Sequence, residues 1–193
     1  MSFVTILYAA LFYFAATILF VGLAYRVYEY AKIPAPLKIP TPPAPMTQRG
    51  VAIRIFREVV FFESLFSATK WTWLFSWIFH LALLLAALRH LKYFTDPVWF
   101  WVSSELVQVA GHYAAYLMLA GLLGLFARRV FVDRVRYISS PSDYLILVLI
   151  IAIAGSGLMM KWFPSDILAI KLFFVGLLTF NFSELPSDAV LLI

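Results

Sequence analysis

The stretch WTWLFSWIFHLALLLAALRHL, residues 71–91, decides the fold class of this chain. It is almost entirely apolar, and it has the length of a helix that crosses the ~30 Å hydrocarbon core of a bilayer. Inside lipid a backbone must satisfy its own hydrogen bonds, so such a segment spans as an α-helix. Its ionisable side chains are His80, Arg89 and His90. Ionisable groups deep in a span are rare and usually functional.

The remainder of the chain repeats this apolar pattern. Of its 193 residues, 64% are hydrophobic and 13% are charged, whereas a soluble domain carries about a quarter charged residues. Three further apolar blocks have the length of a span, and they cover Phe3–Tyr25, Leu106–Phe126 and Tyr144–Trp162. Gly111, Gly121 and Gly124 of the second of these blocks should allow close helix contacts. Trp71, Trp73 and Trp77 at the start of residues 71–91 are typical of an interfacial belt. The pattern predicts an all-α membrane protein in which residues 1–193 form a single integral membrane domain, a bundle of four complete transmembrane helices plus the start of a fifth.

The segments between the spans have patterns of their own. Residues Ile33–Pro45 hold six of the ten prolines, which predicts an extended, polyproline-like segment. Arg49–Lys70 alternates charged and apolar residues at helical spacing, which is typical of a helix on the membrane surface. Ile167–Phe180 is too short for a span and suits an interfacial or re-entrant helix.

Two helix starts are predicted near the end of the chain. Ser142 or Asp143 should cap the fourth span. Pro186, Ser187 and Asp188 resemble the start of a further helix, of which Ala189–Ile193 would form the first turn. We therefore expect that a fifth span follows and is missing from the sequence.

Lysine and arginine in short loops predict the orientation of the spans. Seven of these residues lie in the first loop, residues 26–70, and four lie in the third, residues 128–136, against two in each of the other connections. The first and third loops should therefore face the cytoplasm, with the N-terminus outside, in the cytoplasmic (inner) membrane of a prokaryote.

The two histidines of residues 71–91 are the strongest candidates for chemistry. His80 and His90 lie ten residues apart, which places them ~15 Å apart along a helix and ~80° apart around it. Two haems stacked across the bilayer, each taking one axial imidazole from this helix, need such an offset. A quinone or proton-transfer role and simple packing are the alternatives. Cysteine is absent, which excludes thiolate ligands from this chain but leaves bis-histidine haem open.

Three further side chains should lie near the outer end of the same helix. His112, near the outer end of the third span, could be a haem ligand, but a quinone contact or a packing role is favoured. Arg89 and Lys92 flank His90 and could pair with haem propionates or polarise a quinone carbonyl. The alternative for both is that their charged ends simply reach the headgroup region.

Several other functions find no support in the sequence. It contains no P-loop, no G-x-G-x-x-G and no G-x-S-x-G motif, and no basic aromatic surface for nucleic acid. A transporter would favour charged or broken helices at the midplane, which His80 alone does not provide. A cofactor-free membrane anchor for a larger complex remains the main alternative to an electron-transfer protein.

The sequence resembles the nitrate reductase gamma-subunit family of di-haem cytochromes b. The H-x9-H pair His80/His90 and the R-V-R-x-x-S-x-x-x-D stretch of residues 134–143 carry the family-level likeness. The segments at residues 35–41, 56–58, 62–66, 70–75, 88–94 and 132–139 are similar to the cytochrome b subunit of the Dsr membrane complex of sulfur metabolism.

The resemblance implies a five-helix bundle with two haems b that exchanges electrons with a membrane quinone pool. It implies His80 and His90 as axial ligands, a quinone near the outer haem, and two further ligand histidines on a last span beyond Ile193. The implied partner is a cytoplasmic iron–sulfur protein similar to heterodisulfide reductase catalytic subunits (DsrK), with a DsrC-type sulfur carrier and the other Dsr subunits beyond it.

Overall fold

The computed structural model describes residues 2–34, 45, 47–160, 162 and 166–185, and every regular element in these ranges is a helix. Four of the helices are long and apolar enough to cross a membrane, which confirms the predicted all-α membrane fold. They are α1 (Phe3–Lys32), α4 (Lys70–His90, continued by the short 3-10 helix η1, Leu91–Tyr93), α5 (Glu105–Phe131) and α7 (Pro141–Met159). Four shorter helices connect or flank them, and these are α2 (Gln48–Phe61), α3 (Glu63–Ala68), α6 (Asp133–Ile138) and α8 (Ile167–Thr179).

Several boundaries differ from those predicted. Helix α1 continues beyond Tyr25 to Lys32, and α5 continues beyond Phe126 to Phe131, so part of the predicted basic loop is helical. The cap of α7 is Ser140 rather than Ser142 or Asp143. Pro141 takes the first helical position, where its missing N–H costs nothing, and Asp143 completes a capping box with Ser140.

Two predicted segments fall mostly or entirely outside the described ranges. These are the proline-rich stretch Ile33–Pro45, of which residues 35–44 are not described, and the predicted helix start at residues 186–193.

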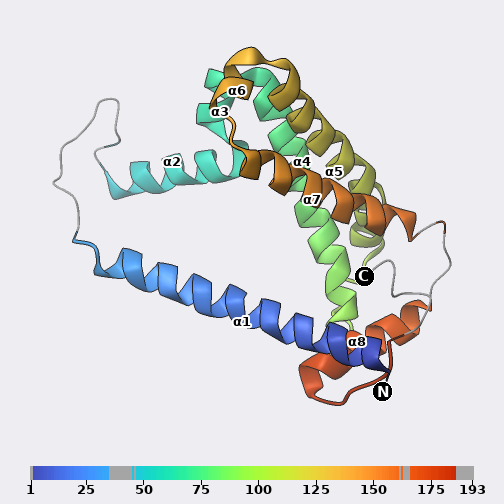
Figure 1. Ribbon diagram of the computed structural model, residues 1–193. Coiled ribbons are helices and arrows are strands. Elements are labelled where there is room, and N and C mark those ends of the chain that lie inside the picture. The colour runs from blue at the N-terminus through green and yellow to red at the C-terminus, as the bar shows by residue number, and fades with distance from the viewer. Residues whose placement is uncertain (1, 35–44, 46, 161, 163–165, 186–193) are drawn as a thin grey trace.

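Helix α5 is the centre of the packed part, with α4 on one side and α7 on another (Figure 1). In its most apolar window 22% of residues are buried, against 6% to 11% in the other three spans. Most apolar side chains of the four spans are therefore exposed on the molecular surface, as expected where lipid is the solvent.

Glycines let α4 and α5 approach closely, as their positions in the sequence predicted. A Cβ on Gly121 would lie 3.0 Å from the carbonyl oxygen of Phe75 and 3.1 Å from the backbone nitrogen of Phe79. A Cβ on Gly124 would overlap the ring of Phe75, and one on Gly111 would lie 2.8 Å from the Cβ of Arg89. The three glycines fix an antiparallel pairing in which Gly111 is level with Arg89, and Gly124 with Phe75.

The junction of α5 and α7 is held by polar contacts. The guanidinium of Arg129 donates to Ser139 Oγ at 2.9 Å and lies 3.5 Å from the Asp143 carboxylate. The Tyr144 hydroxyl donates to the carbonyl of Arg129 at 3.0 Å. The short helix α6 lies within this junction, so the turn between the two spans has a defined path.

Helix α1 stands away from the other spans and packs mainly through its N-terminal end against α8 (Figure 1). Ala9 of α1 is buried with Phe173, Leu177 and Leu185. The hydroxyl of Tyr13 donates to the carbonyl of Leu177 at 2.6 Å. The contact holds α8, which is too short to span, beside the start of α1, while the remainder of α1 is exposed.

The close α4–α5 pairing makes a testable prediction with a matched control. Gly121→Leu places a side chain against the backbone of α4, whereas a Cβ on Gly155 of α7 meets nothing within 4 Å. Overpacking a tight interface costs about 1–3 kcal/mol. Thermal unfolding of the purified chain in detergent should therefore show a lowered Tm for Gly121→Leu and little change for Gly155→Leu. Equal effects of both substitutions would contradict the pairing.

Candidate functional site

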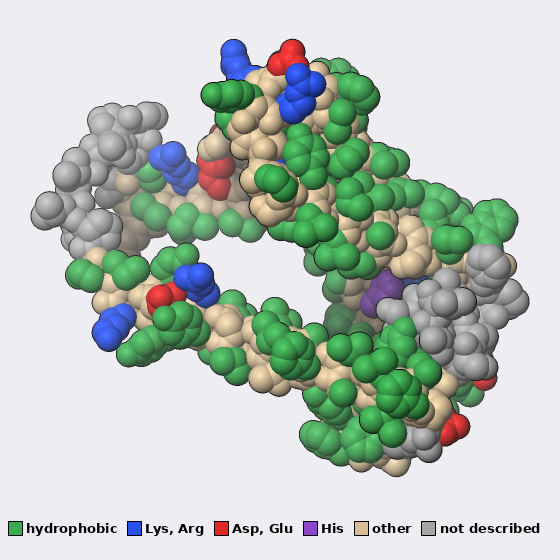
Figure 2. All heavy atoms as spheres, in the orientation of Figure 1, with side chains coloured by type: hydrophobic (Ala, Val, Ile, Leu, Met, Phe, Trp, Pro, Cys, Tyr) green, Lys and Arg blue, Asp and Glu red, His purple; other side chains and the backbone are tan. Residues whose placement is uncertain are grey.

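Both predicted ligand histidines of α4 lie to one side of the centre of its contact with α5. The residues of α4 that contact α5 include Phe75, Phe79 and Arg89. Angles around the axis of α4 can be measured from the mean direction of these three side chains. At ~100° per residue, the His90 side chain then lies ~60° from that direction and the His80 side chain lies ~140° from it. Both imidazoles are exposed on the surface of the chain. Figure 2 shows histidine at the edge of a hollow between α1 and the packed helices, lined largely by hydrophobic side chains.

The two imidazoles are held in the same way. His80 Nδ1 lies 2.7 Å from the carbonyl oxygen of Ser76, and His90 Nδ1 lies 2.6 Å from that of Ala86. A carbonyl oxygen only accepts, so each Nδ1 must donate and carries the proton. In a neutral ring the lone pair is then on Nε2, on the other side of the imidazole from that hydrogen bond.

This arrangement fits axial ligation of haem iron. Such a ligand is a neutral imidazole, and a second hydrogen bond from its other nitrogen to a carbonyl fixes the ring and raises the basicity of the ligand nitrogen. The described residues contain no group of three or more histidine, cysteine, aspartate or glutamate side chains that could bind a metal ion by themselves. Haem iron, already held by a porphyrin, needs only the single imidazole that each position offers.

Two aromatic rings flank His80 near the middle of α4. The imidazole is packed edge-on against the ring of Phe79, at 4.8 Å between centroids, and against the ring of Phe62, at 5.1 Å. Phe62 is not on a helix. It joins α2 to α3 in the left-handed conformation with φ 51°, which is unusual for a bulky side chain.

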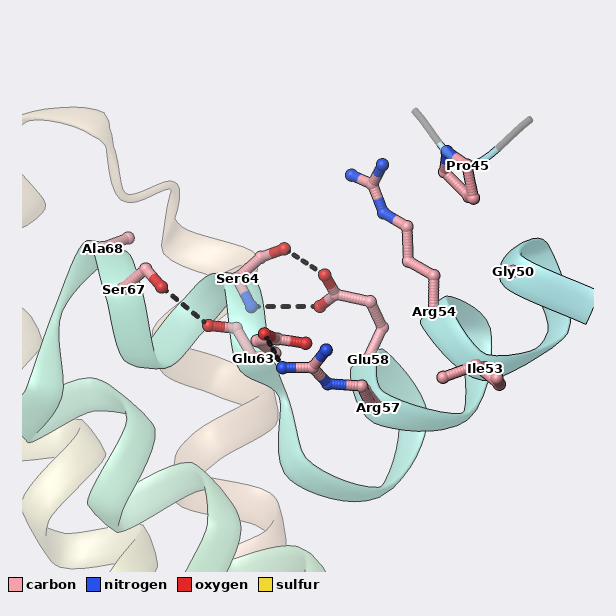
Figure 3. Close-up of a pocket in the computed structure, with 10 residues that line it drawn as sticks. All are labelled: Pro45, Gly50, Ile53, Arg54, Arg57, Glu58, Glu63, Ser64, Ser67 and Ala68. Atoms are coloured by element: carbon pink, nitrogen blue, oxygen red, sulfur yellow. Dashed lines mark hydrogen bonds and ion pairs between the residues drawn. The ribbon is translucent and has the colours of Figure 1, made fainter. Parts of the chain in front are cut away.

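Side chains on both sides of Phe62 hold this bend, named here the α2–α3 corner (residues 57–64). Figure 3 shows Glu58 turned toward Ser64 and Arg57 toward Glu63. The amide of Ser64 donates to Glu58 Oε2 at 3.1 Å and its hydroxyl donates to Oε1, while Arg57 and Glu63 form an ion pair. The hydrogen bonds from Ser64 lower the pKa of the Glu58 carboxyl, with smaller contributions from Arg54 and Arg57, so the carboxylate is the form that the corner requires.

Two tryptophans of α4 attach the corner to the span. The indole of Trp73 donates to the carbonyl of Phe61 at 2.6 Å, and that of Trp77 donates to the carbonyl of Val60 at 3.1 Å. These carbonyls belong to the last turn of α2, where helix carbonyls have no partner within the helix. The sequence predicted both tryptophans as an interfacial belt. Their role as caps depends on a bend that the sequence pattern did not reveal.

The other predicted site residues gather at the opposite end of α4. Arg89 packs against Gly111, which places the neighbouring His112 at the level of His90, as predicted. His112 is exposed and its ring contacts Tyr113 at 5.3 Å. Lys92 reaches α5, with its Nζ 3.4 Å from Gln108 Oε1. The structure thus groups His90, Arg89, Lys92 and His112 at one level and leaves His80 separate, next to the aromatic rings.

Gln108 is a member of this group that sequence reasoning missed. Its Nε2 donates to the carbonyl of Val102 at 2.8 Å while its Oε1 faces Lys92. It therefore ties Lys92 and the loop before α5 to the same point. A lone glutamine in the first turns of a span is a weak signal, and nothing in the pattern links it to Lys92.

Comparison with known proteins identifies similar chains. The family model described as nitrate reductase gamma subunit matches residues 62–184. A protein of Archaeoglobus fulgidus, an Hdr-like menaquinol oxidoreductase cytochrome b-like subunit, is 33% identical over 88% of this chain and 63% of its own length. A protein of the same description from Archaeoglobus profundus is 32% identical over 96% of this chain and 66% of its own length. The chain thus spans just under two thirds of the length of these curated relatives. No solved structure matches it significantly.

The Glu58 carboxylate makes a pH prediction for the α2–α3 corner. Its folded pKa is below the ordinary value of 4.5, so its contribution is complete above that value and is lost as the pH falls through the lowered pKa. Amide hydrogen exchange at Ser64, corrected for intrinsic rates, should accelerate over that acid range. Glu58→Gln keeps an acceptor for the amide but cannot titrate, so its exchange should not change there. Acid-induced acceleration of the same size in this variant would contradict the assignment.

Proposed function

The chain belongs to the nitrate reductase gamma subunit family, and on this premise we propose that it is a membrane cytochrome b that passes electrons between a quinone pool and a cytoplasmic iron–sulfur partner. The observation that carries the proposal is the matched state of His80 and His90. Each donates through Nδ1 to a carbonyl of its own helix, and each is exposed on the surface of the chain. A ring that is oriented in this way and not enclosed by packing leaves Nε2 available to a haem iron.

In this proposal each histidine of α4 is an axial ligand of one haem b. Bound haem supplies one-electron chemistry, and the protein supplies ligation, spacing and a low dielectric. The offset of ~15 Å along the helix places one ligand in the cytoplasmic half and the other at the outer end. The carbonyls of Ser76 and Ala86 hold the two rings in position. The remaining ligands are expected from a further span.

The outer group of residues is proposed as the quinone end. Arg89 makes no ion pair with a described residue, so its guanidinium can pair with a haem propionate or polarise a quinone carbonyl. Lys92, held by Gln108, is the second cation at this level. His112 is proposed as a quinone contact rather than a ligand. The printed description of the relatives names menaquinol, and a menaquinone pool is accordingly the proposed substrate class.

The sequence resemblance supports a more specific assignment of the chain and of its partner. We infer that the chain corresponds to DsrM, with a DsrK-like iron–sulfur subunit as its direct partner, in dissimilatory sulfur metabolism. The relatives are described as Hdr-like, which supports a partner related to heterodisulfide reductase. The lysine and arginine distribution supports a cytoplasmic first loop and an N-terminus outside, in a prokaryotic cytoplasmic membrane.

A cofactor-free membrane anchor remains the second candidate. It would use the same exposed spans to bind other membrane subunits, and the largely exposed α1 favours it to that extent. It offers no reason for two imidazoles with identical hydrogen bonds on one helix. Haem content therefore separates the two candidates.

Substitution of the two α4 histidines tests the cytochrome assignment. Each of His80→Ala and His90→Ala, made in the native protein and purified from its own membranes, should lose about half of the haem b measured as pyridine haemochrome. His112→Ala is the control and should retain the full content. Full haem content in both α4 variants, or absence of haem from the folded native protein, would overturn the assignment and leave the anchor.

Arg89 gives a prediction for the outer end. A cation near a haem disfavours its oxidised form by Coulomb repulsion, so Arg89→Gln should lower the midpoint potential of the haem at His90 by tens of millivolts and leave that at His80 nearly unchanged. Redox titration followed by visible spectroscopy measures both. An equal shift of the two potentials would indicate a general structural effect instead.

A further inference from the structure

The α2–α3 corner borders an open cleft of about 960 Å³ on the surface of the chain. Its walls come from α2 on one side and α3 on the other, and Figure 3 shows the side chains that line it. The polar ones are Arg54, Arg57, Glu58, Glu63, Ser64 and Ser67. The residues that hold the corner together thus also form the wall of the cleft, so its shape is fixed by the same hydrogen bonds and ion pair.

The cleft lies at the positively charged end of the molecule. Residues 48–70 carry four basic and two acidic side chains, and residues 128–143, which pass through α6, carry the same numbers. The contact of Gly124 with Phe75 places the end of α5, which leads into α6, beside the start of α4, which follows α3. Most of the net charge of +5 is therefore concentrated here, which favours an acidic partner.

One residue of the α2–α3 corner, Phe62, contacts His80. Phe62 is the vertex of the corner, flanked in sequence by cleft residues, and its ring packs edge-on against the His80 imidazole. The indoles of Trp73 and Trp77 fix the backbone just before Phe62. A protein seated in the cleft would therefore lie beside the corner residue whose ring contacts His80.

We propose that this cleft is the docking site for the acidic surface of the cytoplasmic electron-carrying partner, and that Phe62 is the positioning residue between that partner and His80. This inference rests on the proposed function and identifies the surface at which the proposed partner would bind. The mixture of both charge signs and serine hydroxyls on a concave wall suits a specific protein contact better than a layer of anionic headgroups. The α2 wall also lies outside residues 62–184, which the family model matches, as expected if it selects a particular partner.

Photocrosslinking in the native complex tests the location. The photoreactive residue replaces Ser67 in the cleft in one variant and Tyr137, which is 91% exposed on α6 at the same end, in the control. The complex is purified by a tag on this chain, and haem and iron are measured on the same sample. We expect adducts to an iron–sulfur subunit from position 67 and few from position 137. Adducts to lipid alone, no protein adduct from position 67, or adducts mainly from position 137 would overturn the proposal.

Charge reversal tests the recognition. Arg54→Glu should weaken retention of the partner at least about tenfold, the equivalent of ~1.4 kcal/mol, whereas Arg134→Glu on α6 makes the same change outside the cleft and should have little effect. Equal weakening by both would show general attraction rather than a cleft and would overturn the proposal. A sample without haem would instead contradict the proposed function, so the two failures are distinguishable.

Phe62→Leu tests the positioning role, since it keeps an apolar side chain at the corner but removes the ring that contacts His80. We expect an altered low-temperature EPR signal from the inner haem only, with haem content unchanged. Phe79→Leu, which removes the other ring beside His80, is the comparison for local packing and should leave partner retention unchanged. Unaltered spectra and partner retention in Phe62→Leu would contradict the role of Phe62.

Discussion

The close approach of α4 to α5 is the constraint on which the other features depend. Three glycines of α5 remove the side chains that would hold the two helices apart, and the backbone of α4 at Phe75 and Phe79 occupies the space. This contact takes one face of α4 and leaves the opposite side exposed. His80 and His90 lie ~140° and ~60° from the centre of that face, so the packing that stabilises the pair also decides where the two imidazoles can act. Without the glycines, α4 could rotate and the histidines would have no fixed direction.

The hydrogen bonds and neighbours of the two α4 histidines determine what each can do chemically. A histidine whose Nδ1 donates to the carbonyl four residues earlier is fixed both in ring orientation and in tautomer, and α4 builds the same bond twice. One ring lies near the middle of α4 against Phe62 and Phe79, and the other lies beside Arg89 at the C-terminal end of the helix. The surroundings of the two rings therefore differ. Those of His80 are aromatic and adjoin the charged α2–α3 corner, whereas those of His90 are cationic and are the proposed quinone end.

The sequence predicted the number and order of the spans well, because length and hydropathy are local properties of the chain. It also predicted that Gly111, Gly121 and Gly124 make close helix contacts and that His112 lies level with His90, both of which the structure confirms. The bend at Phe62 was not predictable, since a phenylalanine at positive φ carries no sequence signal and is held by partners from another helix. The cap at Ser140 was missed because Ser139, Ser140, Ser142 and Asp143 all lie within two residues of Pro141, and only the backbone decides among them. The haem-ligand roles of His80 and His90 stay predictions.

The most direct test of the central claim is an electron cryomicroscopy structure of the native complex, resolved well enough to orient imidazole rings. We expect two haem irons bonded to Nε2 of His80 and of His90, with each Nδ1 still donating to the carbonyl of Ser76 or Ala86. Irons held by other residues, or rings of His80 and His90 that contact only lipid and neighbouring helices, would contradict it.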